Sequence, residues 1–155
     1  MKHWIERYCV AHKADFQKQY PSAFKDGHYS PPILPKTKTA NGLTLFIMNF
    51  LKWNGWRATR INTVGRSVDR IKVEESGSRF REKKWIKGST RKGTADISAT
   101  IRGRSVMMEI KAGEDRPSVD QILEQALERK AGGIYEFIKT PDDFFELYDS
   151  LTEQQ

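Results

Sequence analysis

Residues 92–111 read KGTADISATIRGRSVMMEIK, and this stretch decides the fold. Apolar and β-branched residues run on both sides of Arg102-Gly103, a dipeptide that suits a tight turn between two strands. The pattern therefore predicts a β-hairpin with strands at 95–101 and 105–111.

Three charged residues in this hairpin are the candidate chemistry. Asp96 opens the first strand, and Glu109 lies near the end of the second, two residues before Lys111. Alternate residues of a strand share a face, so Glu109 and Lys111 should lie side by side, with Asp96 at the same end of the sheet. Two carboxylates suit Mg²⁺ or Mn²⁺, with the main-chain carbonyl of Ile110 as a third ligand, and such an ion promotes phosphodiester hydrolysis. The alternative is an ordinary surface hairpin with a Glu–Lys pair.

Helices and short strands are expected around the hairpin, in the order α-β-β-β-α-β-α about a small mixed sheet. The C-terminal helix has the clearest start, because Thr140 can cap it and a proline follows. The other expected elements are a helix from Thr39 to Asn54, a strand at 56–61, a helix at 118–131 with Ile122, Leu123, Ala126 and Leu127 facing inward, and a strand at 134–138.

Two further regions frame this core. Residues 2–19 show helical periodicity, and the prolines within 20–36 predict an irregular tether. We therefore divide the chain into an N-terminal helical extension, 1–36, and a main domain, 37–155. The stretch 62–93 is polar and glycine-containing, which predicts a loop with a short strand around Trp85-Ile86.

Positive charge is concentrated before the hairpin. Residues 57–92 hold 12 Lys/Arg against 4 Asp/Glu, whereas residues 93–155 hold 7 against 13. A basic segment beside an acidic one suits a protein that holds a polyanion, with DNA as the expected partner. The alternative is a solvated charged loop. The candidate phosphate contacts are Arg57, Arg60, Asn62, Arg66, Arg70, Lys87, Arg91, Lys92 and, beyond the hairpin, Arg116.

Composition bears on the compartment. The single cysteine, Cys9, excludes an internal disulfide and a cysteine-rich zinc site. No segment approaches the ~20 apolar residues of a membrane span, and the first residues lack the apolar core of a signal peptide. The sequence therefore predicts an intracellular, cytoplasmic protein with no membrane partner.

Taken together, these motifs resemble the PD-(D/E)xK nuclease superfamily, and within it the VRR-NUC family of small virus-type nucleases. The matching segments are Lys92–Asp96, Glu109–Lys111, Asp115–Gln121 and Ala131–Gly133, within residues 39–150. The resemblance implies a restriction-endonuclease-like αβββαβ core and a DNA endonuclease dependent on Mg²⁺ or Mn²⁺. It implies that Asp96 and Glu109 bind the metal, that Lys111 is catalytic and that Gln121 supports the site. It also implies branched or junction DNA as substrate and a homodimer.

The sequence departs from the superfamily pattern in its first core helix. Many members carry a glutamate there, whereas residues 39–54 contain no acid, and Asn41 or Asn49 could offer an amide oxygen instead. Gln121 has a second interpretation, because Ser118-x-x-Gln121 is a capping box. The alternatives to an active nuclease are a catalytically inactive nucleic-acid-binding module on the same fold and a protein whose basic face docks an acidic partner.

Overall fold

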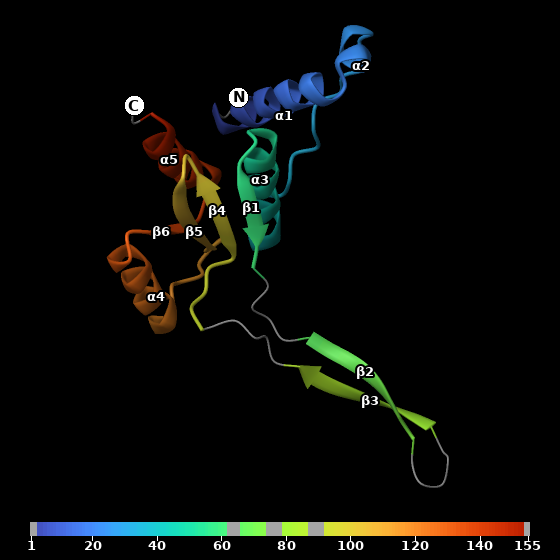
Figure 1. Cartoon of the computed structure of the whole chain (residues 1–155), viewed down its shortest axis with the longest axis vertical. Helices are drawn as coiled ribbons and strands as arrows, with labels where there is room; N and C mark the ends of the chain where they lie inside the picture. Colours follow the sequence, from blue (N-terminus) through green and yellow to red (C-terminus); the bar gives the residue numbers. More distant parts are fainter. Residues whose placement is uncertain (1–2, 62–65, 74–78, 87–91, 154–155) are drawn as a thin grey trace.

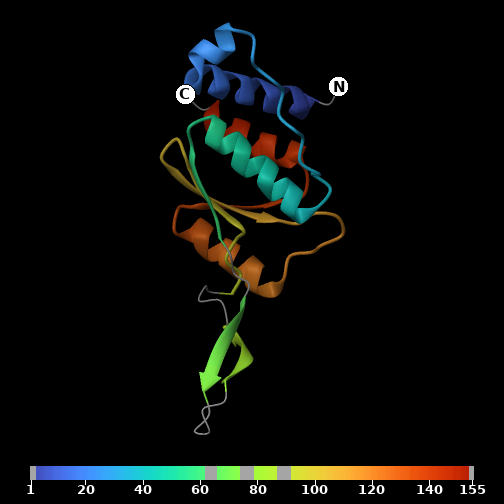
Figure 2. The same cartoon turned by 90° about the vertical axis from the view of Figure 1, so that its right-hand side faces the viewer.

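The computed structural model of the chain describes residues 3–61, 66–73, 79–86 and 92–153. These residues form a mixed α/β structure with a four-stranded sheet, a separate two-stranded sheet and five helices (Figure 1). Helices α1 (His3–Gln19), α3 (Ala40–Trp53) and α5 (Pro141–Thr152) lie on one side of the four-stranded sheet. Helix α4 (Val119–Lys130) lies on the other side (Figure 2).

The four-stranded sheet has the order β1-β4-β5-β6. Its strands are β1 (Arg57–Arg60), β4 (Ile97–Ile101), β5 (Arg104–Ile110) and β6 (Ile134–Ile138). The pairs β1–β4 and β4–β5 are antiparallel and β5–β6 is parallel, so the sheet is mixed, as predicted. The predicted hairpin is confirmed as β4–β5.

The hairpin turn shows why the local sequence is so predictive. Arg102 and Gly103 both have positive φ, 48° and 78°. That conformation matches the right-handed twist of the flanking strands in two-residue turns.

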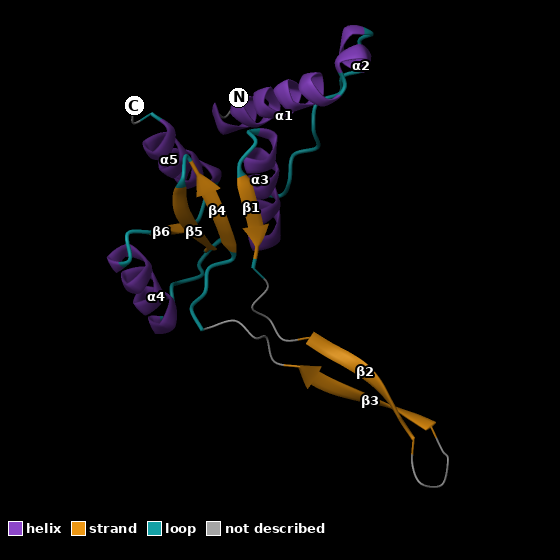
Figure 3. Cartoon of the chain, viewed as in Figure 1, coloured by secondary structure: helices purple, strands orange, loops and turns teal. Residues whose placement is uncertain are grey.

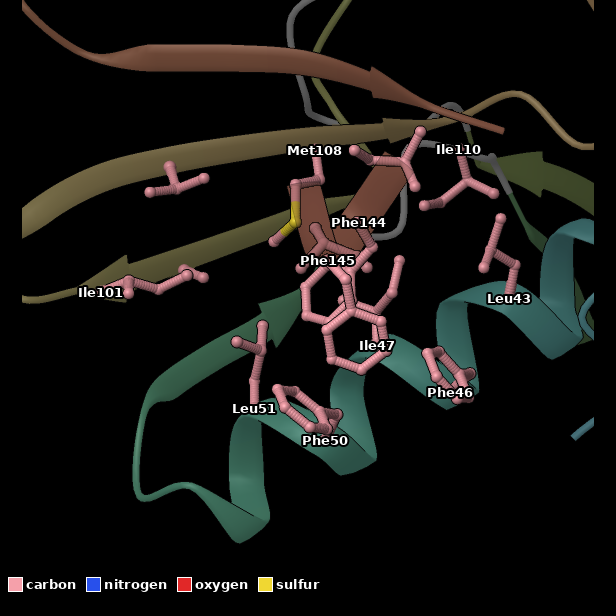
Figure 4. Close-up of a cluster of buried hydrophobic side chains, with 14 of the residues drawn as sticks. Leu43, Phe46, Ile47, Phe50, Leu51, Ile101, Met108, Ile110, Phe144 and Phe145 are labelled. Carbon is pink, nitrogen blue, oxygen red and sulfur yellow. The ribbon is translucent and has the colours of Figure 1, made fainter. Parts of the chain in front are cut away.

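The hydrophobic core lies between the sheet and helices α3 and α5 (Figure 4). Thr39 caps α3 through its side chain, and Thr140 with Asp143 forms a capping box at the start of α5, so both predicted helix starts are confirmed. Strand β5 directs alternate side chains into this core. The buried side chains from these elements include Leu43, Phe46, Ile47, Phe50, Leu51, Ile101, Val106, Met108, Ile110, Phe144 and Phe145.

Helix α1 is part of the same core. Tyr8 is fully buried and stacks on Phe46 with ring centroids 4.5 Å apart. Arg7 forms a two-pronged ion pair with Asp149, at 2.5 and 2.7 Å, and lies over the Phe145 ring. Helix α1 therefore braces α3 and α5.

The predicted irregular tether at 20–36 is wrong over one short segment. Helix α2 occupies Pro21–Lys25, because the ring of Pro21 fixes a helical φ at a first-turn position that needs no N–H donor (Figure 3).

Helix α4 forms where predicted, but its predicted orientation is wrong. Ile122, Leu123 and Leu127 are 51%, 58% and 47% exposed. The polar stripe of the helix faces the sheet instead, because Gln125 and Arg129 donate to the main-chain carbonyl of Tyr135 on the edge strand β6. The apolar stripe is thereby turned outward.

The predicted loop at 62–93 is also wrong over two segments, although the short strand expected around Trp85-Ile86 is confirmed as the end of the second one. β2 (Arg66–Val73) and β3 (Arg79–Ile86) pair as an antiparallel two-stranded sheet. Alternating hydrophobicity marks a strand with one buried face. Ile71 and Val73 are 69% and 63% exposed, so these strands lack a buried face and their sequence lacks that pattern.

No helix in the described part of the chain is both long and apolar enough to cross a membrane.

Candidate active site

Asp96 is held at one end of the four-stranded sheet by main-chain contacts from two neighbouring strands. Its side-chain Oδ2 accepts a hydrogen bond from the Ile110 N–H at 3.0 Å. Its main-chain carbonyl accepts one from the Ile61 N–H at 2.7 Å, just after β1. The start of β4 thus lies beside the ends of β1 and β5.

Glu109 and Lys111 lie together on the sheet face that α4 covers. Lys111 Nζ is 3.2 Å from Glu109 Oε1 and 3.1 Å from Asp115 Oδ2. The Glu109 and Lys111 side chains are only 7% and 6% exposed, whereas Asp115 is 57% exposed. Strand alternation explains the placement, since Met108 and Ile110 point into the core and their neighbours point the other way. The cluster is thus buried at its base and open to solvent on the Asp115 side.

The buried cluster shifts both titrating groups. Burial raises the pKa of the Glu109 carboxyl to about 6, the nearby negative charge of Asp96 adds to the shift, and Lys111 opposes it. Burial alone would lower the pKa of Lys111, but its hydrogen bonds to Asp115 and Glu109 outweigh burial and raise it. Lys111 is therefore a cation at neutral pH. Ionising Glu109 costs folding free energy when no other cation is bound beside it.

Gln121 forms the predicted capping box and also contacts the Glu109 carboxylate. Its Oε1 accepts from the Ser118 N–H at 2.9 Å, and Ser118 Oγ accepts from the Gln121 N–H, which completes the capping box of α4. Its Nε2 donates a hydrogen bond to Glu109 Oε1. The two ends of one amide thus join the helix start to the buried carboxylate, and the cap fixes the orientation of the donor.

Two residues that sequence reasoning did not select hold the site together. Asp115 is the second partner of Lys111, and its i, i+4 spacing from that lysine was a signal for this contact in the sequence. Tyr135 on β6 donates through its hydroxyl to the Gly93 carbonyl at 2.9 Å, which anchors the segment that leads to Asp96. Burial, with Glu109 and Asp96 nearby, raises the pKa of Tyr135, so the hydroxyl keeps its proton.

Gly93 lies against the first turn of α4. Its φ is +80°, and a Cβ built there would collide with the main-chain carbonyl of Asp120 in the first turn of the helix. Only glycine allows this approach without strain.

Three oxygen donors near the end of the sheet are the candidates for holding a hard cation. In a strand, the N–H and C=O of one residue point to the same edge, so the Ile110 carbonyl lies on the side from which its N–H reaches Asp96. Asp96, Glu109 and this carbonyl are oxygen donors of the kind that Mg²⁺ and Mn²⁺ bind. Among the described residues, no group of three or more His, Cys, Asp and Glu side chains is placed to hold a metal ion. On the acid-free helix, Asn41 Oδ1 accepts a hydrogen bond from Arg60, and Asn49 donates one to the Tyr8 hydroxyl through its Nδ2.

The predicted phosphate contacts are spread over several elements. Arg57 and Arg60 are exposed on the edge strand β1, and Arg60 is paired in register with Ile97, directly after Asp96. Lys92 and Arg116 are exposed in the segments before β4 and before α4. Arg66 begins β2, and its side chain lies outside the description. Asn62, Lys87 and Arg91 lie outside the described residues.

Comparison with known proteins gives no relative: no protein-family model matches the chain, and no curated protein is significantly similar to it.

Proposed function

We propose that this protein is a metal-dependent nuclease that hydrolyses DNA phosphodiester bonds, with a site of the PD-(D/E)xK, VRR-NUC type. The observation that carries the proposal is the buried Glu109–Lys111 pair beside Asp96, held by Gln121. Burying a carboxylate that prefers to be neutral costs stability, and a pair of apolar residues would pack better. A bound cation would offset this cost, because it would stabilise the ionised Glu109 carboxylate.

The residues that would hold Mg²⁺ or Mn²⁺ are Asp96, Glu109 and the carbonyl of Ile110. When bound, the ion would supply Lewis acidity toward a phosphate oxygen and would acidify a water molecule. Asp96 is fixed for this task by the Ile110 N–H, so little ordering is needed on binding. Gln121 holds Glu109 Oε1 from the other side.

Lys111 acts in this proposal as a fixed positive charge. Its raised pKa keeps Nζ protonated, so it donates hydrogen bonds and is a poor general base. A buried ammonium group is well suited to stabilise negative charge that develops on a phosphoryl oxygen. Arg60, near the end of β1 beside Asp96, is placed to contact a neighbouring phosphate.

Asp96→Asn tests the proposal directly. The amide keeps the shape of the side chain but loses its charge, so cleavage should fall about a thousandfold, which corresponds to the several kcal/mol a metal ion supplies. Cleavage of supercoiled, linear and four-way-junction DNA is measured in Mg²⁺ and in Mn²⁺, and binding to each is measured in EDTA.

The same assay separates the two functions. If Asp96→Asn still binds DNA but no longer cleaves it, the result supports a nuclease. If the wild-type protein binds every substrate and cuts none in either metal, the catalytically inactive binding module is correct. Faster cutting of the junction than of linear DNA would support the branched substrate that the family resemblance implies.

We also propose a homodimer formed through the outward face of α4. This face carries a hollow of about 450 Å³ whose lining includes Asp120, Leu123, Leu127 and Lys130. In an antiparallel pair of these helices, Asp120 of one copy would oppose Lys130 of the other, and Leu123 would oppose Leu127. The face is thus self-complementary in both charge and apolar contact, which a two-fold interface requires.

A charge exchange tests the dimer. Lys130→Asp places two acids opposite each other and should raise the dimer dissociation constant about tenfold, whereas Asp120→Lys with Lys130→Asp should restore it. Sedimentation equilibrium measures the association. The wild-type protein is also measured at a concentration on the order of 100 μM, which is 100-fold above that of the nuclease assay. If it is still monomeric there, this interface is excluded.

A further inference from the structure

Strands β2 and β3 form a projecting ribbon, here termed the β2–β3 arm. They pair with each other from Arg66↔Ile86 to Val73↔Arg79 and with no strand of the four-stranded sheet. The arm extends away from the sheet and its helices (Figures 1 and 2). An isolated two-stranded ribbon is only marginally stable in water, so regular pairing over eight residues in each strand calls for a partner.

The charge of the arm identifies the partner's chemistry. Its two strands contain seven Lys/Arg and two acids, Asp69 and Glu82, which gives a net charge of +5. Opposed residues of an antiparallel pair share a face, so Arg70 lies on one face while Arg81 and Lys83 lie on the other. One acid is already neutralised, because Lys72 Nζ is 2.8 Å from Glu82. A ribbon with cations on both faces suits a polyanion that surrounds it.

Apolar side chains of the arm lie between these cations. Ile71, Val73 and Phe80 are 69%, 63% and 43% exposed, all in the half of the arm farther from the sheet. Phosphates alone would not require them. Base edges in a groove offer apolar contacts, such as the thymine methyl, together with flanking phosphates.

We propose that the β2–β3 arm inserts into the major groove of B-form duplex DNA. This rests on the proposed DNA substrate, although not on catalysis. The groove is ~12 Å wide and admits a two-stranded ribbon. Eight residues at ~3.3 Å each span about 26 Å, which is the length of roughly eight base pairs. The arm would hold the duplex while the Asp96–Glu109–Lys111 end of the sheet meets a phosphate.

Two competing nucleic acids fit the arm less well. The major groove of A-form RNA is deep and narrow, and side chains do not read it. Proteins that bind single strands use aromatic platforms. The two strands of the arm contain two aromatic residues, Phe80 and Trp85, against seven Lys/Arg.

The test compares two variants that each lose four positive charges. The arm variant is Arg70→Ala, Arg79→Ala, Arg81→Ala and Lys83→Ala. The control variant is Lys13→Ala, Lys18→Ala, Lys25→Ala and Lys52→Ala, all exposed and on helices away from the arm. Binding to a 20-base-pair DNA duplex, the same duplex in RNA and one DNA strand is measured in EDTA from ~50 to 300 mM salt. EDTA separates binding from cleavage.

The arm variant should bind duplex DNA about 100-fold more weakly at low salt, and its salt slope should fall by about 3.6, since each of the four lost phosphate contacts contributes ~0.9. The control should keep the wild-type slope. Equal slopes for the two variants would overturn the proposal, as would equal wild-type affinity for RNA and DNA duplexes. If the arm variant loses self-association and not DNA binding, the arm pairs with a second copy and the proposal is wrong. Wild-type binding through the arm without cleavage would refute the nuclease alone.

Discussion

Glu109→Gln is expected to abolish cleavage and, at the same time, to make the metal-free protein more stable at high pH. The amide cannot supply the charge that a cation needs, so cleavage should fall about a thousandfold. Gln keeps an oxygen that can accept the hydrogen bond that Gln121 donates to Oε1. Opposite effects on activity and stability mark a residue kept for function.

The sign of the pH effect follows from the raised pKa. Because the pKa of Glu109 is about 6 in the folded protein against 4.5 as its reference, the folded state binds more protons between these values. Stability is therefore fully present below pH 4.5 and is lost as the pH rises through 6. Wild-type protein should lose about 2 kcal/mol relative to Glu109→Gln between pH 4 and pH 8.

Denaturant unfolding at several pH values, in EDTA, measures this difference. Glu146→Gln, at an exposed position on α5, controls for the loss of one negative charge. Adding Mg²⁺ at pH 8 should stabilise the wild-type protein and leave Glu109→Gln unchanged. A pH-independent difference between the two proteins would show that Glu109 is not held in the environment described above.

Gly93→Ala should be the most damaging single-methyl change near the site. Alanine there meets two penalties: a positive φ of 80°, worth ~1–2 kcal/mol, and a collision with the Asp120 carbonyl, worth ~1–3 kcal/mol. The variant should lose about 2–5 kcal/mol of stability, or roughly 10 °C in Tm. Relief of the collision would move α4 away from the strands and weaken the Gln121–Glu109 contact.

Gly103→Ala provides the matched comparison. Gly103 has nearly the same φ, 78°, but a Cβ there meets nothing within 4 Å. It should therefore show the backbone penalty alone, about 1 kcal/mol. Thermal unfolding of the two variants measures the difference. Equal losses would mean that the contact between residue 93 and α4 does not constrain the fold.

Local patterns in the sequence were enough to predict most of the elements around the site. The β4–β5 hairpin, the Thr39 and Thr140 caps and the strand at 134–138 follow from turn chemistry, capping residues and apolar periodicity. Each of these signals is contained within a few neighbouring residues. The proximity of Asp96, Glu109 and Lys111 then follows from strand pairing.

Predictions failed where the outcome depended on what an element packs against. The apolar stripe of α4 predicted an inward face, but the polar contacts of Gln125 and Arg129 with β6 turned it outward. The β2–β3 arm left no alternating pattern because it buries neither face. Periodicity reports that a face is apolar, and it does not report whether a partner covers that face.

By itself, the sequence determined the hairpin of residues 92–111 and the chemical types that it carries. Short-range sterics and strand alternation are sufficient for that. Only the tertiary structure decided that Glu109 is buried, that both ends of the Gln121 amide are used, and that Tyr135 and Gly93 hold the approach to Asp96. These features form when α4 and β6, which follow the hairpin in the chain, pack against it. Glu109 is buried only after this packing, and its burial raises its pKa.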